Sequence, residues 1–221
     1  MIPALALAAT LSTTHAAPLA PVTVTINVVS RERKPVSLEF ATSDAFFVLI
    51  RDAKGSVVFD SRAGHTPIQI HRTLDFTSGT NRIASYDWGG LTDNRRAPDA
   101  PAKYTLHVEM PALQTTLVAD LPFALDAPAT VATVLASQKP VLFTLAGTQE
   151  RSGPTFFLRD DTGTIQISRP LGLFPQGIFF VRGSVERSNL GVRFLIDHSA
   201  PAASNENPGG TPIPRATAPP K

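Results

Sequence analysis

The chain has 221 residues, no cysteine and a formal net charge of +2. The absence of cysteine excludes a disulfide framework, a thiolate nucleophile, a zinc finger and a lipid anchor on cysteine. A net charge this close to zero argues against a high-affinity binder of duplex DNA, because such binding depends on many lysine and arginine contacts to phosphates.

The N-terminal residues have features of a signal peptide. Residues 4–11 are apolar, and the small residues Thr14 and Ala16 flank His15 as they do at a signal-peptidase site. We therefore predict export to the periplasm or the medium, with a signal peptide at 1–16 that is cleaved after Ala16. The apolar run is shorter than the about 20 residues that span a bilayer, so the mature chain is not expected to insert into a membrane. The alternative is a disordered Ala-rich tail on a cytosolic protein.

From residue 22 the pattern is one of successive β-strands. Apolar and polar residues alternate in 22–28 and 36–40, which is the period of a half-buried strand. Residues 45–50 are a continuous apolar run, as in a strand of a sandwich core, and a turn then leads to a hairpin partner at 56–59. Further strands are expected at 68–74, 81–86, 104–110 and 116–123. About seven or eight short strands predict an immunoglobulin-like sandwich over 17–126.

A second group of strands begins near residue 139. These strands are expected at 141–147, in a hairpin at 155–167, and in a pair at 177–186 and 191–197. With glycines where a small barrel must bend, they predict a closed or nearly closed barrel at 139–198. Residues 127–138 are predicted to be a linker with a helical turn or a leading strand. Few large apolar residues follow, so a disordered Pro-rich tail is predicted at 199–221.

The first block carries a series of features in a defined order: the strand Lys34–Phe40, the apolar run Ala45–Ile50, the turn and strand Asp52–Phe59, then Trp88 and a late strand from Tyr104. In these features about residues 22–125 resemble the BsuPI-type proteinase inhibitor family. The resemblance implies an immunoglobulin-like sandwich that binds another protein, and it makes proteinase inhibition a candidate activity.

The second block carries the pattern F-x-L-x-D-x-x-G-x-I, from Phe156 through Asp160 and Gly163 to Ile165. In this pattern residues 139–198 look like an OB-fold of the small bacterial or nucleic-acid-binding kind. The helix usually found between the third and fourth strands of that fold is reduced to a Pro-bounded loop at 170–175, which would have to plug the barrel. The predicted fold class is therefore all-β: an immunoglobulin-like β-sandwich followed by a small OB-like β-barrel.

The sequence contains no recognisable catalytic or metal-binding pattern. The histidines are scattered, no serine lies in a G-x-S-x-G elbow, and the consecutive residues Asp197–Ser199 cannot face one another on a strand. Asp87, Asp93 and Asp99 lack the spacing of an EF-hand. We therefore predict no enzymatic activity, no catalytic residue, no metal site and no cofactor.

The loop at 87–101 is longer than a strand connection requires. It contains Trp88, Arg95, Arg96 and Pro98, and exposed tryptophan and arginine are favoured anchors of protein interfaces. We predict that this loop engages a protein or envelope partner. If the module inhibits proteases, Arg95 or Arg96 would enter the cleft of a trypsin-like serine protease. The alternative is that Trp88 packs on the sandwich core and that the rest of the loop is solvated.

Strand alternation divides the barrel residues into an inner and an outer set. The residues predicted to face outward are Phe157, Arg159, Gln166, Phe180, Arg182 and Arg193. Interleaved aromatic and arginine side chains suit single-stranded nucleic acid, because they supply faces for stacking and cations for phosphates. The alternative is that the first domain or the linker covers this side and that the arginines pair with Asp160, Asp161 and Glu186.

These patterns together predict an exported, non-enzymatic binding protein. Its sandwich module is expected to engage a protein or envelope partner through its loops, with the OB-like domain as a second binding or spacer unit. Two alternatives remain open: a secreted proteinase inhibitor that acts through loop 87–101, and binding of single-stranded nucleic acid by the barrel.

Overall fold

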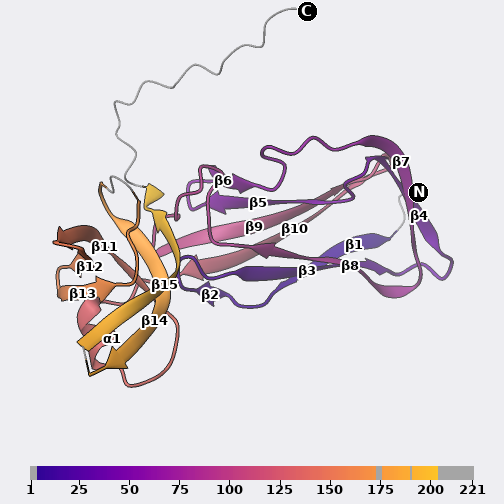
Figure 1. Ribbon diagram of the computed structural model, residues 1–221. Helices are drawn as coiled ribbons and strands as arrows, with labels where there is room; N and C mark the ends of the chain where they lie inside the picture. The colour runs from indigo at the N-terminus through magenta and orange to yellow at the C-terminus, as the bar shows by residue number, and fades with distance from the viewer. Residues whose placement is uncertain (1–3, 173–175, 190, 204–221) are drawn as a thin grey trace, which may run out of the picture.

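Alternating apolar residues produce β-strands along nearly the whole chain, as the computed structural model shows for residues 4–172, 176–189 and 191–203 (Figure 1). The predicted fold class is confirmed, because an all-β sandwich is followed by a small closed barrel. The sandwich strands are β1 (Leu5–Leu11), β2 (His15–Ala16), β3 (Val22–Ser30), β4 (Val36–Thr42), β5 (Phe47–Asp52), β6 (Val57–Asp60), β7 (Gln69–Phe76), β8 (Gly79–Trp88), β9 (Ala102–Pro111) and β10 (Thr116–Leu125). The remaining elements are α1 (Val131–Ala136), β11 (Phe143–Ser152), β12 (Thr155–Asp160), β13 (Gly163–Ile167), β14 (Phe179–Ser188) and β15 (Gly191–Pro201).

Two main sheets form the sandwich. One has the strand order β1-β3-β8 and the other β2-β10-β9-β5-β6, while β4 and β7 pair as a separate two-stranded sheet. The alternation along β3 buries Val22, Val24 and Ile26 completely, and they join one core with side chains of β5 and β9. Complete burial of such a side chain stabilises the fold by about 1.5–3 kcal/mol.

The sandwich begins before residue 17. β1 pairs antiparallel with β3 from Leu5 opposite Ser30 to Leu11 opposite Val24, and β2 pairs in parallel with β10. Leu7 and Leu11 of β1 pack against the core. In the full chain, the segment predicted to be a signal peptide is therefore an edge strand of the sandwich. The same short apolar run has the composition of a signal peptide and also forms an edge strand.

The barrel closes in the strand order β11-β12-β13-β15-β14, and only the β13–β15 pair is parallel among its described pairings. The residues that strand alternation places inward form its core or pack against it: Phe156, Leu158, Ile165, Ile167, Phe179, Val181, Val192, Phe194 and Ile196. Two glycines permit its tight curvature, as predicted. A Cβ on Gly147 would overlap the carbonyl oxygen of Arg159, and a Cβ on Gly183 would overlap that of Leu195.

The predicted linker at 127–138 contains a helical turn, as expected, but it packs on the barrel. Thr130 caps α1 by accepting a hydrogen bond from the backbone N–H of Thr133 at 3.2 Å. Val131 and Val134 of α1 are fully buried in the barrel core. The loop at 170–175 was expected to plug the barrel, but α1 covers residues of the barrel core. Of that loop, residues 173–175 lie outside the described part of the chain.

The two domains meet through apolar side chains of both. This junction buries Leu19, Ala97, Phe180, Ala200 and Ala202. The backbone N–H of Ala97 donates to the Pro201 carbonyl at 2.9 Å, and the Ala203 N–H donates to the Ala97 carbonyl at 2.9 Å. The barrel domain therefore extends past residue 198, the predicted boundary. The rest of the predicted disordered tail, residues 204–221, lies outside the described residues.

Candidate binding surfaces

The loop at 87–101 does not present Trp88 or Pro98 to solvent. Trp88 is 1% exposed, its Nε1–H donates to the Leu91 carbonyl at 2.8 Å, and its ring meets Phe123 edge-on at 5.6 Å. Pro98 is buried as well. Trp88 is therefore not an exposed anchor, and the alternative in which it packs on the sandwich core is correct. The reason is that β8 continues to Trp88, which lies opposite Val22 and faces the core.

The remainder of the loop is fastened to both domains. Arg96 Nη1–H donates to the Ala202 carbonyl at 3.4 Å, which ties the loop to the end of the barrel. On the other side, the Asp93 N–H donates to the Val58 carbonyl at 3.2 Å, and the Asp93 carboxylate accepts from the N–H of Asp60 at 2.9 Å. Of the four residues predicted for a protein-binding loop, only Arg95 is exposed. The loop therefore connects the domains and covers the edge of β6.

The outer face of the barrel brings some of the predicted residues together. Gln166 lies opposite Phe157 on β12 and opposite Arg193 on β15, so these three residues form a row across three strands. Arg182, on β14, lies opposite Thr144 and is half-buried. Phe180 is separated from this row, because it is buried in the domain junction. The predicted outer set is therefore not one continuous surface.

Carboxylates neutralise two arginines of this face. Arg159 Nη1 lies 3.0 Å from Glu150 Oε1, and Arg193 Nη2 lies 2.6 Å from Glu186 Oε2. The alternative that we considered is thus correct for Arg193 and Glu186, whereas Arg159 pairs with Glu150 rather than with Asp160 or Asp161. These pairings reduce the charge available to phosphate groups.

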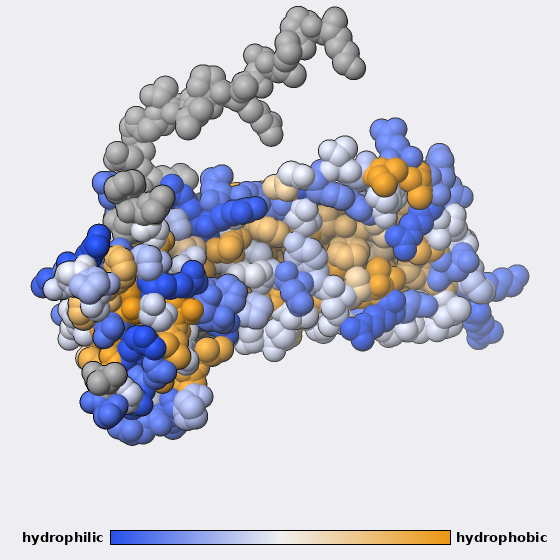
Figure 2. Space-filling view, in the orientation of Figure 1, coloured by the Kyte–Doolittle hydropathy of each residue, from blue (hydrophilic) through white to orange (hydrophobic). Residues whose placement is uncertain are grey.

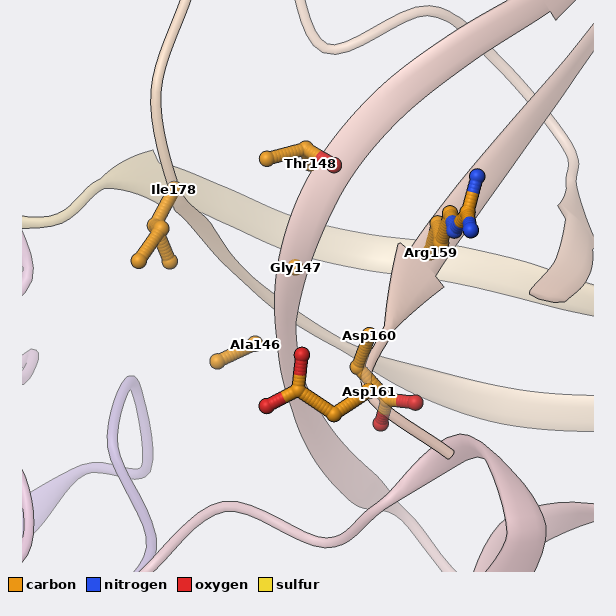
Figure 3. Close-up of a pocket in the computed structure, with 7 residues that line it drawn as sticks. All are labelled: Ala146, Gly147, Thr148, Arg159, Asp160, Asp161 and Ile178. Atoms are coloured by element: carbon orange, nitrogen blue, oxygen red, sulfur yellow. The ribbon is translucent and has the colours of Figure 1, made fainter. Parts of the chain in front are cut away.

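A cavity of about 270 Å³ lies beside β11 and the end of β12 (Figure 3). Arg159, Asp160 and Asp161 lie on one side of it, and Ile178 lies on the other.

The Asp160 carboxylate joins two segments of the barrel domain through hydrogen bonds. One carboxylate oxygen accepts from the Val131 N–H at 2.7 Å, and the other accepts from the N–H and hydroxyl of Thr162 at 2.8 and 2.7 Å. Burial opposes its ionisation, but the hydrogen bonds outweigh burial and lower the pKa of Asp160. Asp160 therefore fastens α1 to the β12–β13 turn.

The sandwich is open along one edge, between β5–β6 and β8. A cavity of about 460 Å³ lies there, and a second of about 280 Å³ adjoins it between β7 and β8; the two share Arg72 and Ile83. We call the surface that lines both cavities the open-edge groove. Its apolar side chains are Ala45, Phe46, Phe47, Leu74, Phe76, Ile83 and Tyr86. In Figure 2, hydrophobic surface follows the seam between β5–β6 and β8, with hydrophilic surface on both sides.

β8 has no strand on the groove side. It is the last strand in the order β1-β3-β8, and no backbone–backbone hydrogen bond joins it to anything except β3 in the part of the chain that the structure describes. The pairing of β8 with β3 shifts register between Ile26 and Asn27, which leaves Ile83 without a partner on β3. This β-bulge gives Ile83 its place on the groove wall.

Three arginines line the groove, and they differ in their partners. The Arg62 guanidinium donates to both oxygens of Asp60 and lies 4.1 Å from the centre of the Phe47 ring. These hydrogen bonds lower the pKa of Asp60, so this pair stays ionised at neutral pH. Arg72 donates to the Ser43 carbonyl and Arg82 to the Ser85 hydroxyl, and no described carboxylate pairs with either.

The open-edge groove was not predicted from the sequence. Arg72 and Arg82 were available as a signal, since both are arginines within predicted strands. Arg72 lies on β7, whereas Arg82 and Ile83 lie on β8, and these two strands belong to different sheets. Alternation within one strand therefore does not show that the three residues line the same cavity.

The described residues contain no cluster of three side chains arranged to bind a metal ion. Across the same residues, no helix has both the length and the apolar character needed to cross a bilayer.

Comparisons with known proteins leave the family open. No protein-family model and no curated protein matches the chain. A β-glucuronidase of Bacteroides uniformis resembles 69% of the chain over 14% of its own length, with 13% identity and a TM-score of 0.32. A β-glucosidase from Listeria innocua in complex with gluconolactone resembles 56% of the chain over 16% of its own length, with 7% identity and a TM-score of 0.31. The chain thus spans less than a fifth of either enzyme, and likeness at this level supports no conclusion about function.

Proposed function

We propose that the protein is a non-enzymatic binding protein whose sandwich domain holds a segment of a protein partner in the open-edge groove. The observation that carries this proposal is a pair of adjoining cavities, lined by both apolar side chains and arginines, beside a strand edge to which no described segment is hydrogen-bonded. The resemblance of residues 22–125 to the BsuPI-type family favours a protein ligand. The site lies outside loop 87–101, because that loop is fastened between the barrel and β6.

The dimensions of the groove suit a peptide segment better than a small metabolite. Taken together, the linings of the two cavities include residues of β8 between Asn81 and Tyr86. Six strand residues extend over about 17 Å at about 3.3 Å per residue, which accommodates a similar length of extended chain. Ile70 on β7 and the preceding Ile68 are exposed apolar side chains outside both cavities. In this proposal the barrel is a second unit that holds the 87–101 loop in place.

Capture from the envelope and culture fluid of the producing cell tests the site. We expect the wild-type chain to retain a protein partner and the double variant Arg72→Glu, Arg82→Glu to lose at least about 90% of it. Lys103→Glu is the matched control, because it reverses an exposed charge on β9 that does not line the groove. Equal capture by the double variant would refute the proposed site. A serine protease that is lost on Arg95→Ala alone would support the inhibitor alternative instead.

We also propose that the protein is exported, on the strength of the N-terminal apolar run and the residues around Ala16. Cleavage after Ala16 would remove β1 and β2 and leave β3 and β8 as a two-stranded sheet, with their pairing intact. We expect the intact mass of protein purified from its native source to correspond to a chain that begins at Ala17. A mass that includes residues 4–16 would contradict this proposal and would make β1 part of the mature sandwich.

A further inference from the structure

We infer that the exported form of the chain binds an extended apolar strand of a partner protein at the place that β1 and β2 occupy in the full chain. This inference rests on the proposed export and cleavage after Ala16, and it concerns the surface that cleavage exposes. We call that surface the strand slot. Residues 24–30 of β3 and residues 124–126 at the end of β10 form it. β1 and β8 flank β3 on opposite sides, so the strand slot and the open-edge groove lie at opposite edges of this sheet.

The side chains of β1 show which residues the strand slot accepts. Three alternate side chains of β1 pack against the sandwich core: Leu7, Ala9 and Leu11. The β3 residues directly opposite them are fully buried: Val28, Ile26 and Val24. Ala6 and Thr10, at intervening positions, are exposed. Because side chains paired on one face of a sheet stabilise it together, an incoming strand needs apolar residues at alternate positions and tolerates polar residues between them.

The backbone of the strand slot also favours a strand as the ligand. β1 pairs with β3 over seven positions. The Ala124 N–H donates to the Thr14 carbonyl at 2.9 Å. The Asp126 N–H donates to the Ala16 carbonyl, also at 2.9 Å. Cleavage after Ala16 removes both acceptors and the whole of β1. The backbone groups that lose their partners form the kind of edge to which an extended segment of another protein binds by strand addition.

One continuous strand fits the strand slot better than a second copy of the chain does. The segment at 5–16 pairs antiparallel with β3 and then in parallel with β10, so it covers the edges of both sheets in one pass. Two cleaved copies that met through their β3 edges would leave β10 uncovered. An uncovered apolar strand edge promotes aggregation. The occupant is therefore an extended segment of a partner, which must follow β3 for about seven residues, or about 24 Å.

A synthetic copy of the removed segment tests the strand slot. The protein is purified from its native source, and its intact mass shows where the chain begins. The probe is a fluorescent peptide of residues 4–16, and binding is followed by fluorescence anisotropy. We expect the chain that begins at Ala17 to bind the peptide. The recombinant full chain should bind it at least about 100-fold more weakly, because its own tethered segment competes at an effective concentration on the order of millimolar.

Two variant peptides test whether the segment binds in the register of β1. The peptide with Leu7→Asp and Leu11→Asp should bind at least about tenfold more weakly than the unmodified peptide, because it places charge against the apolar core. The peptide with Ala6→Asp and Thr10→Asp is the matched control. It carries the same added charge at the two exposed positions of β1, so its affinity should stay within about threefold of the unmodified peptide.

Failure of the cleaved chain to bind the peptide, or equal effects of the two pairs of substitutions, would overturn the inference. Dimers of the cleaved chain that the peptide does not dissociate would also overturn it, because a second copy would then occupy the strand slot. If the cleaved chain is unfolded by itself, the peptide should restore its circular dichroism spectrum, and no recovery would refute the strand slot. An intact mass that includes residues 4–16 would refute the proposed cleavage, and the inference with it. Failure of peptide binding alone would leave the export proposal standing.

Discussion

Replacing Gly183 with alanine is expected to unfold the barrel under conditions in which the wild-type chain is fully folded. Gly183 lies on β14 at the point where its pairing with β15 shifts register. An added Cβ would overlap the Leu195 carbonyl oxygen and approach the Phe194 ring to 3.0 Å. Because that oxygen belongs to the backbone of the paired strand, no side-chain rotation relieves the overlap. We expect the free energy of unfolding to fall by about 3 kcal/mol or more, at the upper end of overpacking costs.

Gly163→Ala is the matched control for this prediction. It places the same methyl group in the same barrel, where the nearest atom, Cγ1 of Val131, would lie at an ordinary contact distance of 3.5 Å. We expect its effect to remain within about 0.5 kcal/mol. Urea denaturation followed by far-ultraviolet circular dichroism measures both variants. Equal stability of the two would show that the strands separate at little cost and would contradict the role assigned to Gly183.

The strands were predictable because burial on one face imposes a period of two on the sequence. Val22, Val24 and Ile26 illustrate this, since polar residues separate them and all three are fully buried. The same rule placed Leu158 and Phe194 inside the barrel and Arg159 outside it. Strand ends were less predictable. β8 was expected to end at Tyr86, and two more residues of the same alternation would have placed Trp88 on the core face.

Features that depend on two separate segments were not predictable from local pattern. Phe180 faces outward from the barrel, as alternation requires, but the sandwich domain covers it. The open-edge groove has a similar origin. Arg72 lies on β7 and Ile83 on β8, and these consecutive strands pair with different partners rather than with each other. The bulge at Ile83 has no glycine to mark it in the sequence.

The N-terminal run shows a different limit. Residues 4–11 are small and apolar, which is the composition of a signal peptide, and they also match β3 over seven paired positions. Sequence pattern alone does not separate the two roles, because both require little more than apolar character. The mass of the mature protein separates them.

Replacing Trp88 with alanine is expected to lower the free energy of unfolding of the sandwich by about 3–5 kcal/mol, the usual cost of removing a buried tryptophan. Its ring contacts Phe123 and lies 6.5 Å from Phe59, so the truncation would leave a cavity between the two sheets. The lost Nε1–H bond would also release the Leu91 carbonyl at the start of the loop. Circular dichroism is the appropriate readout, because Trp88 is the only tryptophan.

Arg95→Ala separates the structural role of the loop from a binding role. Arg95 is exposed in the same loop, so its removal should change stability by no more than about 0.5 kcal/mol. If the loop only connects the domains, this variant should also capture the protein partner as the wild type does. A small effect of Trp88→Ala on stability would contradict its place in the core. Loss of partner capture on Arg95→Ala would move the binding site from the open-edge groove to the loop, because nothing else about the fold would have changed.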